Sequence, residues 1–456
     1  MLRIAATFFY ALFVVVGTVV VFADDGSPTW KLREREEISD ACNNVAIGFT
    51  FVPRQDAMYV GFYSYDHTMT IGRRAYDAER WELKKLPTKI SSDSHNYIAM
   101  TFDSDDVLHV SGNMHASPLI YFRAKKPNDI ESLEQVKSMV GDLENRCTYP
   151  TFLRDKGGRL IFTYRDGSSG NGNQIWNVYD EASKTWSRLL DKPLFDGQGQ
   201  MNAYFRGPTL GADGFFHVCW VWRDTPDAAT NHDLSYVRSP DLIHWEKSNG
   251  EPCELPITIE TGEIVDPVPA KGGILNSHVA LSFDQENRVV LTYTKYDEKG
   301  RLQIWNARLE NDGWRKVAAT NWDFTWNFSG GGSLFNELGM SGVRVASPDK
   351  LALSWTQVPQ NKSGVVFLDA DTLEPCDAPP KSDVKRRPDY SPEDAKALND
   401  VETNDERLHA ASATSEVNGE RWVFRWERPD ANRDRPIPGD PPEPTTFRVF
   451  KFERNQ

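Results

Sequence analysis

Seven segments of the chain share one pattern of hydrophobic and polar positions. Each has a turn followed by residues that alternate between apolar and polar and that end in aromatic side chains. The segments begin near Met58, Val107, Arg159, Phe215, Arg288, Lys350 and Arg421. Alternation with period two is typical of a β-strand with one buried face. The spacing of roughly 50 to 75 residues is in the range of propeller blades.

Weaker strands are expected between these segments, closed by Trp81, Trp186, Trp245 and Trp314. Helical periodicity is confined to two short stretches, residues 128–139 and 392–398, and the polar stretch 379–403 is expected to be a loop insertion. A sandwich of this length would need division by a linker, and a β-helix would need a shorter repeat. The pattern therefore predicts an all-β fold, with residues 24–456 forming one seven-bladed β-propeller closed by the N-terminal strand or by residues 447–452.

The first 23 residues carry a targeting pattern. Arg3 precedes an almost wholly apolar run over residues 8–22, and Ala23 is followed by two aspartates. This is typical of a secretory signal peptide cleaved after Ala23. The alternative is an uncleaved membrane anchor, for which the run is short, since a span needs roughly 20 apolar residues. We expect a secreted or periplasmic protein with no membrane contact after cleavage.

The amino-acid composition narrows the classes of molecule that the protein could bind. The formal net charge is −14, with 52 basic and 66 acidic residues, which argues against binding to nucleic acid. An anionic sugar is still compatible, because a local basic pocket can hold a carboxylate in an acidic protein. Five cysteines are too few for a scaffold built on disulfides. We expect a monomer without an organic cofactor.

The densest group of candidate catalytic residues comes from the second and third repeats. It comprises His95, His115, Tyr149 and Arg165. Histidine and tyrosine can transfer protons, and arginine can neutralise a carboxylate. Each residue also has a structural alternative: Tyr149 could be a packed aromatic, and Arg165 could pair with Asp166.

A second polar group surrounds the fourth repeat. His217 and Cys219 are two residues apart on one strand, so their side chains point to the same side. His232 follows in the next loop, and His278 could come from the next blade. Mixed nitrogen and sulfur ligands suit a structural zinc ion. The alternative is a buried cysteine among hydrogen-bonded histidines.

Three long stretches resemble the BNR-repeat family, which includes the ulvan lyases of polysaccharide lyase families 24 and 25. They begin at Asp93 (DSHNYIAMTFDSDDVLHVSGNMHASPLIYFR), at Cys147 (CTYPTFLRDKGGRLIFTYRDGSSGNGN) and at His217 (HVCWVWRDTPDAATNHDLSYVRS). The resemblance implies a seven-bladed propeller that cleaves a bond to a uronic acid by β-elimination. It also implies a structural zinc, although Ser235 stands where relatives often carry a cysteine.

Carried onto this chain, the resemblance implies a lyase acting on an anionic, ulvan-like polysaccharide. Arg165 would neutralise the uronate carboxylate, and Tyr149 would act as base and could also protonate the leaving oxygen. The two histidines would orient the sugar, share the carboxylate charge, or act as base in place of Tyr149. The candidate substrate-binding residues are Asn96, Asn113, Tyr204, Arg206 and Arg223. The alternatives are a hydrolase like the rhamnosidases of glycoside hydrolase family 145 and a non-catalytic carbohydrate-binding propeller. A hydrolase normally needs paired carboxylates, and none stands out in this group.

Overall fold

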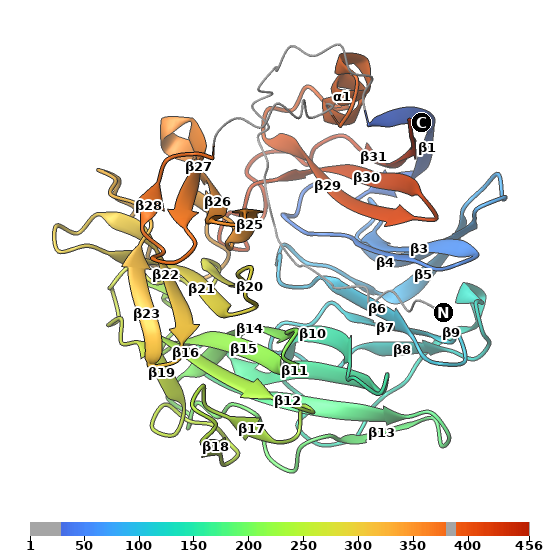
Figure 1. Ribbon diagram of the computed structural model, residues 1–456. Helices are drawn as coiled ribbons and strands as arrows, with labels where there is room; N and C mark the ends of the chain where they lie inside the picture. The colour runs from blue at the N-terminus through green and yellow to red at the C-terminus, as the bar shows by residue number, and fades with distance from the viewer. Residues whose placement is uncertain (1–28, 380–388, 456) are drawn as a thin grey trace.

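Strands provide nearly all of the regular structure in the computed structural model, which describes residues 29–379 and 389–455. Within these residues the strands form seven sheets (Figure 1). The first contains β2 (Thr50–Pro53), β3 (Ala57–Tyr63), β4 (Thr68–Ala75) and β5 (Glu82–Lys89). The second contains β6 (Ile98–Phe102), β7 (Leu108–Gly112), β8 (Tyr121–Ala124) and β9 (Leu133–Gln135). The third contains β10 (Cys147–Arg154), β11 (Leu160–Ser168), β12 (Asn171–Asp180) and β13 (Thr185–Arg188).

The remaining sheets follow in chain order. The fourth contains β14 (Asn202–Leu210), β15 (Phe216–Arg223), β16 (Asn231–Ser239), β17 (Trp245–Glu246), β18 (Pro252–Cys253) and β19 (Glu263–Asp266). The fifth contains β20 (Val279–Phe283), β21 (Val289–Tyr296), β22 (Leu302–Glu310) and β23 (Gly313–Ala318). The sixth contains β24 (Leu338–Met340), β25 (Arg344–Ser347), β26 (Lys350–Gln357), β27 (Lys362–Asp369) and β28 (Pro375–Cys376). The seventh contains β1 (Trp30–Ala41), β29 (Leu408–Val417), β30 (Glu420–Pro429) and β31 (Thr445–Arg454).

The seven repeated segments occupy equivalent places in these sheets. They are the strands β3, β7, β11, β15, β21, β26 and β30, each of which has neighbours on both sides. A strand inside a sheet buries both of its edges, and these strands also pack between sheets, which explains their strong apolar pattern. The expectation of an all-β fold built on one repeated strand is confirmed. The expected closing tryptophans also lie at the outer strands: Trp186, Trp245 and Trp314 lie in β13, β17 and β23, and Trp81 directly precedes β5.

The two ends of the described chain meet in the seventh sheet. Its strand order is β1-β31-β30-β29, and β1 pairs antiparallel with β31 from Trp30 opposite Arg454 to Ala41 opposite Thr445. Both strands that the sequence offered for closure are therefore used. In Figure 1 the sheets follow one another around the molecule, and the seventh lies beside the first.

Aromatic and aliphatic side chains fill the space between neighbouring sheets. The largest cluster joins the seventh, first and second sheets. Within it the ring of Phe49 stacks on that of Trp426, with centroids 4.7 Å apart. Further clusters join the second sheet to the third and the third to the fourth. This packing fixes the relative positions of the strand ends that carry the polar side chains discussed below.

One of the two expected helices is present. Helix α1 (Pro392–Asn399) begins after Ser391, whose hydroxyl accepts from the amide of Asp394. The helical expectation for residues 128–139 is wrong, because only the 3-10 turn η1 (Ile130–Ser132) forms there before β9. The stretch holds too few periodic residues for a stable helix, and β9 gains a sheet partner instead. Two more 3-10 turns are η2 (Ala228–Thr230) and η3 (Val358–Gln360).

Some of the other expectations concern residues that lie outside the described ranges. The signal peptide lies outside them, as does part of the expected loop over residues 379–403. Among the helices that the structure describes, none has the length and apolar character to span a bilayer. All five cysteines lie in the described residues, and all five are free thiols.

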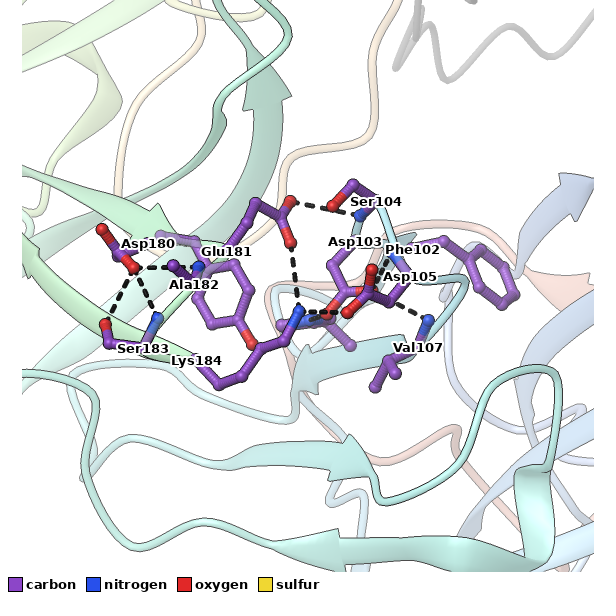
Figure 2. A network of polar contacts seen from close by, with 12 residues as sticks. Phe102, Asp103, Ser104, Asp105, Val107, Asp180, Glu181, Ala182, Ser183 and Lys184 are labelled. Atoms are coloured by element: carbon purple, nitrogen blue, oxygen red, sulfur yellow. Dashed lines mark hydrogen bonds and ion pairs between the residues drawn. The ribbon is translucent and has the colours of Figure 1, made fainter.

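Aspartate side chains hold the turns between strands, as Figure 2 shows for the second and third sheets. Asp103 Oδ1 accepts from the amides of Asp105 and Val107, at 3.0 and 2.9 Å. Lys184 of the neighbouring sheet forms an ion pair with Asp105. The second oxygen of Asp103 lies 3.5 Å from Nε2 of the fully buried His109. These contacts give His109 a structural role.

Candidate functional site

Two histidines that are 20 positions apart in the sequence lie together at one edge of the second sheet. His95 precedes β6 and His115 follows β7, and their rings stack with centroids 4.3 Å apart. The carboxylate of Asp93 joins them: its Oδ1 is 2.8 Å from His95 Nδ1 and its Oδ2 is 2.5 Å from His115 Nδ1. The same Oδ1 accepts from the backbone amide of His95 at 2.9 Å, an aspartate turn that fixes the loop.

A residue from the end of the chain completes this group. Asp434, between β30 and β31, has its Oδ2 3.4 Å from His95 Nδ1. Its Oδ1 accepts from the hydroxyl of Ser94 at 2.8 Å, and its Oδ2 accepts from the amide of Ser333 at 2.9 Å. Asp434 therefore connects three segments that are remote in sequence. We call the four residues Asp93, His95, His115 and Asp434 the His–Asp cluster.

The charges of this cluster act on one another. Burial by itself would lower the pKa of His95, but the carboxylates of Asp434 and Asp93 outweigh burial and raise the pKa to about 9. Burial acts to raise the pKa of Asp434, but hydrogen bonding to His95 overrides it and brings the pKa down to about 2. The pKa of Asp93 also lies well below its usual range, because its hydrogen bonds to both histidines outweigh burial.

Next to the His–Asp cluster lie two tyrosines and an arginine, which we call the Tyr–Arg cluster (Tyr149, Arg165 and Tyr204). The ring centroid of Tyr149 is 5.9 Å from that of His95 and 6.2 Å from that of Tyr204. The guanidinium carbon of Arg165 lies 4.9 and 5.8 Å from the centroids of the two tyrosine rings. Arg165 Nη1 also donates to Tyr204 Oη at 3.3 Å.

Local strand geometry presents these side chains to one another. The pairing of β10 with β11 shifts register between Thr148 and Thr151, and Tyr149 has φ = 59° at this bulge. Bulges re-aim side chains, and a tyrosine in the left-handed region is held there by its surroundings. Arg165 is buried in β11, and its Nη2 donates to Thr148 Oγ1 at 3.3 Å. Among the described residues no hydrogen-bond acceptor reaches its Nε, which is itself buried.

The two phenols differ in acidity. Burial raises the pKa of Tyr149 well above its usual value, and Tyr204 adds to the effect. Burial also acts to raise the pKa of Tyr204, but the guanidiniums of Arg165 and Arg223 outweigh it, and the net shift is downward. Ser169 Oγ lies 2.8 Å from Tyr204 Oη and gives further support to an ionised oxygen. Tyr204 is thus the more readily ionised of the two phenols, whereas Tyr149 stays protonated.

The other expected substrate-binding residues have contacts of their own, which for Asn96 is a hydrogen bond to its backbone oxygen. The backbone oxygen of Asn96 accepts from the Tyr63 hydroxyl at 2.5 Å, and the Asn113 amide donates to Lys89 O at 2.9 Å. Arg206 donates to Val279 O at 3.2 Å and to Asn276 O at 3.0 Å. The guanidinium carbon of Arg223 lies 5.5 Å from the ring centroid of Tyr204. Only Tyr204 and Arg223 of the five therefore contact the Tyr–Arg cluster or belong to it.

The expected zinc set (His217, Cys219, His232 and His278) is not brought together. His217 Nδ1 is 2.6 Å from Tyr236 Oη, and its Nε2 is 3.1 Å from Asp213 Oδ1. His278 Nε2 is 2.5 Å from Leu338 O, and burial lowers the pKa of this histidine to about 4.

The other two members are held separately. His232 has a carboxylate at each ring nitrogen, Asp233 at 2.8 Å and Asp224 at 2.9 Å. Cys219 is fully buried in β15, and burial raises the pKa of its thiol to about 12. These residues do not fit a shared ion, because each histidine is satisfied by its own partners.

Among the described residues, one group of three has ligand atoms close enough to hold a metal ion, and it is Asp93, His95 and His115. Sequence reasoning named both histidines but neither aspartate. Asp93 could have been found from its position two residues before His95. No local signal marks Asp434, which lies in a Pro-rich stretch more than 300 residues away.

Comparison with known proteins bears on the family and the fold. Residues 57–322 match the BNR repeat-containing family. A stretch of 57 residues is 39% identical to the long isoform of an ulvan lyase from Glaciecola sp. (strain KUL10), covering 11% of this chain and 6% of that protein. The fold is similar to the crystal structure of polysaccharide lyase Uly1, with a TM-score of 0.56 at 12% identity over 96% of this chain and 94% of that one.

A second solved structure has a similar fold. It is a PL25 ulvan lyase bound to -[GlcA(1-4)Rha3S]-, with a TM-score of 0.54 at 12% identity over 85% of this chain and 92% of that one. At such low sequence identity, the similarity to these structures is evidence for the fold alone. The family match, in contrast, covers more than half of the residues, and the chain therefore belongs to the BNR repeat-containing family.

Proposed function

We propose that the protein is an extracellular polysaccharide lyase that cleaves a uronate-containing, ulvan-like polymer by β-elimination. The single observation that carries the proposal is the Tyr–Arg cluster. In it one buried arginine lies against two tyrosines whose pKa values are shifted in opposite directions. The family membership and the fold shared with polysaccharide lyases support it. We further propose that the seven sheets are the blades of one closed propeller.

The reaction removes the C5 proton of the uronate, forms a C4–C5 double bond, breaks the bond from C4 to the glycosidic oxygen and protonates that oxygen. Arg165, whose guanidinium lies against both tyrosine rings, would neutralise the carboxylate next to C5, which makes the C5 proton more acidic. Tyr204 would accept this proton, since its charged neighbours favour the phenolate. Tyr149 would protonate the leaving oxygen, since burial raises its pKa and keeps the phenol protonated until the reaction.

This assignment differs from the sequence-based expectation that Tyr149 is the base. The difference comes from Arg223 and Ser169, which lie against Tyr204 and favour its ionised form. His95 and His115 would orient the sugar through Nε2, because Nδ1 of each ring faces a carboxylate. Each proton-transfer role contributes roughly 10²- to 10⁴-fold to the rate.

Digestion of a uronate polysaccharide tests the proposal. A lyase produces an unsaturated sugar that absorbs in the ultraviolet, whereas a hydrolase produces saturated reducing ends. A panel of polymers with and without sulfate, including one with repeating GlcA(1-4)Rha3S units, would identify the substrate. Saturated products would replace the lyase by a hydrolase, and binding without any product would identify a carbohydrate-binding propeller.

A further inference from the structure

The ligand atoms of the His–Asp cluster are already close to the spacing that a metal ion requires. Those of Asp93, His95 and His115 lie within 4.8 Å of one another. Asp434 adds a carboxylate oxygen 3.4 Å from Nδ1 of His95. A tetrahedral ion at about 2.0–2.2 Å from each ligand places neighbouring ligand atoms roughly 3.3 Å apart. The three side chains of this group could reach this geometry by small rotations, and Asp434 lies outside the group, against His95.

The donor types indicate the kind of ion. Two imidazoles and the carboxylate of Asp93 favour a divalent transition metal such as zinc, whereas magnesium and calcium prefer oxygen ligands only. Two carboxylates also balance the charge of a divalent cation once both imidazoles are neutral. The cluster is partly shielded: side-chain exposure is 13% for Asp434 and 28% for His115, so an ion could enter.

Contacts outside the cluster hold its ligands in place. The Asp434 carboxylate accepts from both the amide and the hydroxyl of Ser94 and from the amide of Ser333. Asp93 is held by the amide of His95. Such outer contacts orient ligands and typically change metal affinity by roughly 10- to 100-fold. The expected zinc set lacks this arrangement, since its histidines face separate partners.

We propose that the His–Asp cluster binds one divalent transition-metal ion of the zinc type. The ion would bind Nδ1 of both histidines and would leave Nε2 on the opposite side of each ring. It would also join the segment between β30 and β31 to the loops of the second sheet. The site is therefore both a metal centre and a link between the two ends of the chain, and its existence does not depend on the proposed lyase activity.

Metal binding to the full mature chain, stripped with a chelator, tests this directly. Titration calorimetry with zinc is expected to give one site, and the melting temperature is expected to rise with the zinc concentration. Cobalt is expected to bind with the visible spectrum of a nitrogen and oxygen site without a thiolate band. Calcium and magnesium are expected to bind at least tenfold more weakly.

Isosteric variants locate the ion. Asp93→Asn and Asp434→Asn are expected to weaken zinc binding by roughly 10- to 100-fold. Cys219→Ser should leave the affinity unchanged. His244→Gln is the matched control, because His244 also pairs with an aspartate, Asp241 at 2.8 Å, but is 80% exposed.

Two results would overturn the proposal. One is the absence of stoichiometric zinc binding to the wild-type chain. The other is equal zinc affinity in wild type and in Asp93→Asn, with circular dichroism reporting that the variant is folded. Loss of binding in Cys219→Ser alone would place the ion at the expected zinc set instead. Since the readout is binding, failure of the lyase assay would leave these outcomes interpretable.

Discussion

Two groups of histidines looked alike in the sequence, and the structure separates them. In the His–Asp cluster two rings stack at 4.3 Å and share the carboxylate of Asp93. In the expected zinc set each histidine has its own partners, Tyr236 and Asp213 for His217 and a backbone oxygen for His278. Residue type and spacing on a strand therefore do not predict well which side chains come together at one site. What matters is which loops meet at one edge of the sheets.

The two groups also differ in what surrounds them. The His–Asp cluster adjoins an arginine and two tyrosines whose pKa values are shifted, and this combination is typical of functional sites. His217 and Cys219 are buried within β15 among apolar side chains. A neutral histidine that donates and accepts within a core contributes to stability. We therefore expect the first group to control activity and the second to control folding.

The largest effect is expected at Tyr149. Tyr149→Phe removes the only hydroxyl of this ring and should lower kcat by roughly 10²- to 10⁴-fold, since the leaving oxygen then lacks its proton donor. The rate of ultraviolet absorbance increase on a uronate polymer measures this. Tyr204→Phe should cause a loss of similar size. Near-normal turnover in both variants would remove the Tyr–Arg cluster from the reaction.

Arg165 is expected to have the next largest effect. Arg165→Ala should lower kcat/KM by roughly 10²- to 10³-fold, because charge that develops at the uronate carboxylate is no longer stabilised. Arg165→Lys should recover only part of this, because lysine cannot match the planar geometry of a guanidinium. An ultraviolet titration adds a second readout. In Arg165→Ala the absorbance of the Tyr204 phenolate should appear at a higher pH than in wild type. An unchanged titration midpoint would mean that the arginine does not act on this tyrosine.

A variant in the expected zinc set tests whether these histidines contribute to stability and not to activity. His217→Gln should lower the free energy of unfolding by about 1–3 kcal/mol, because Tyr236 and Asp213 lose a buried partner. Urea denaturation measures the loss. Activity per folded molecule should remain within twofold of wild type. A large loss of activity in a folded His217→Gln protein would give this group a functional role after all.

The smallest effect concerns a polar group that belongs to neither cluster and sets the baseline pH dependence of stability. In β1, burial and a hydrogen bond to Glu34 raise the pKa of Glu36 to about 7, although Arg74 lies 2.6 Å away. A carboxyl with a raised pKa stabilises the fold below the pKa of the unfolded chain, near 4.5, and this stabilisation is lost as the pH rises through 7.

Melting temperatures between pH 5 and 8 measure this contribution, which should be about 1 kcal/mol after allowance for partial exposure. Glu36→Gln keeps the neutral form and should flatten the decline across this range. His244→Gln, on an exposed loop, is the control that should leave the slope unchanged. An unchanged slope in Glu36→Gln would assign the pH dependence to another group.

Much of the fold could be predicted because each repeated strand carries a strong local signal. The strands β3, β7, β11, β15, β21, β26 and β30 each begin within two residues of an expected segment. The stretch 128–139 was mistaken for a helix, because polar residues with a few apolar ones also suit a turn and a short outer strand. Helix propensity is weak over residues 128–139, so the pairing of β9 with β8 determines that a strand forms there.

The candidate site was predictable in part. His95, His115, Tyr149, Arg165 and Tyr204 were identified by their residue types and by the family resemblance. Their different acidities could not be predicted, since these depend on Arg223, Ser169 and the two aspartates, which come from other loops. Coulomb energies fall with distance and not with sequence separation, so contacts made by folding control each charge.

The sequence by itself determined the all-β class, the repeated strand and most of the polar residues of the site, because strand periodicity and residue chemistry are local properties. Only the tertiary structure decided that Asp434 lies beside His95 and that the expected zinc set does not converge. The physical reason is closure of the chain. Pairing of β1 with β31 brings the C-terminal segment next to the second sheet's loops, and no local pattern encodes this meeting.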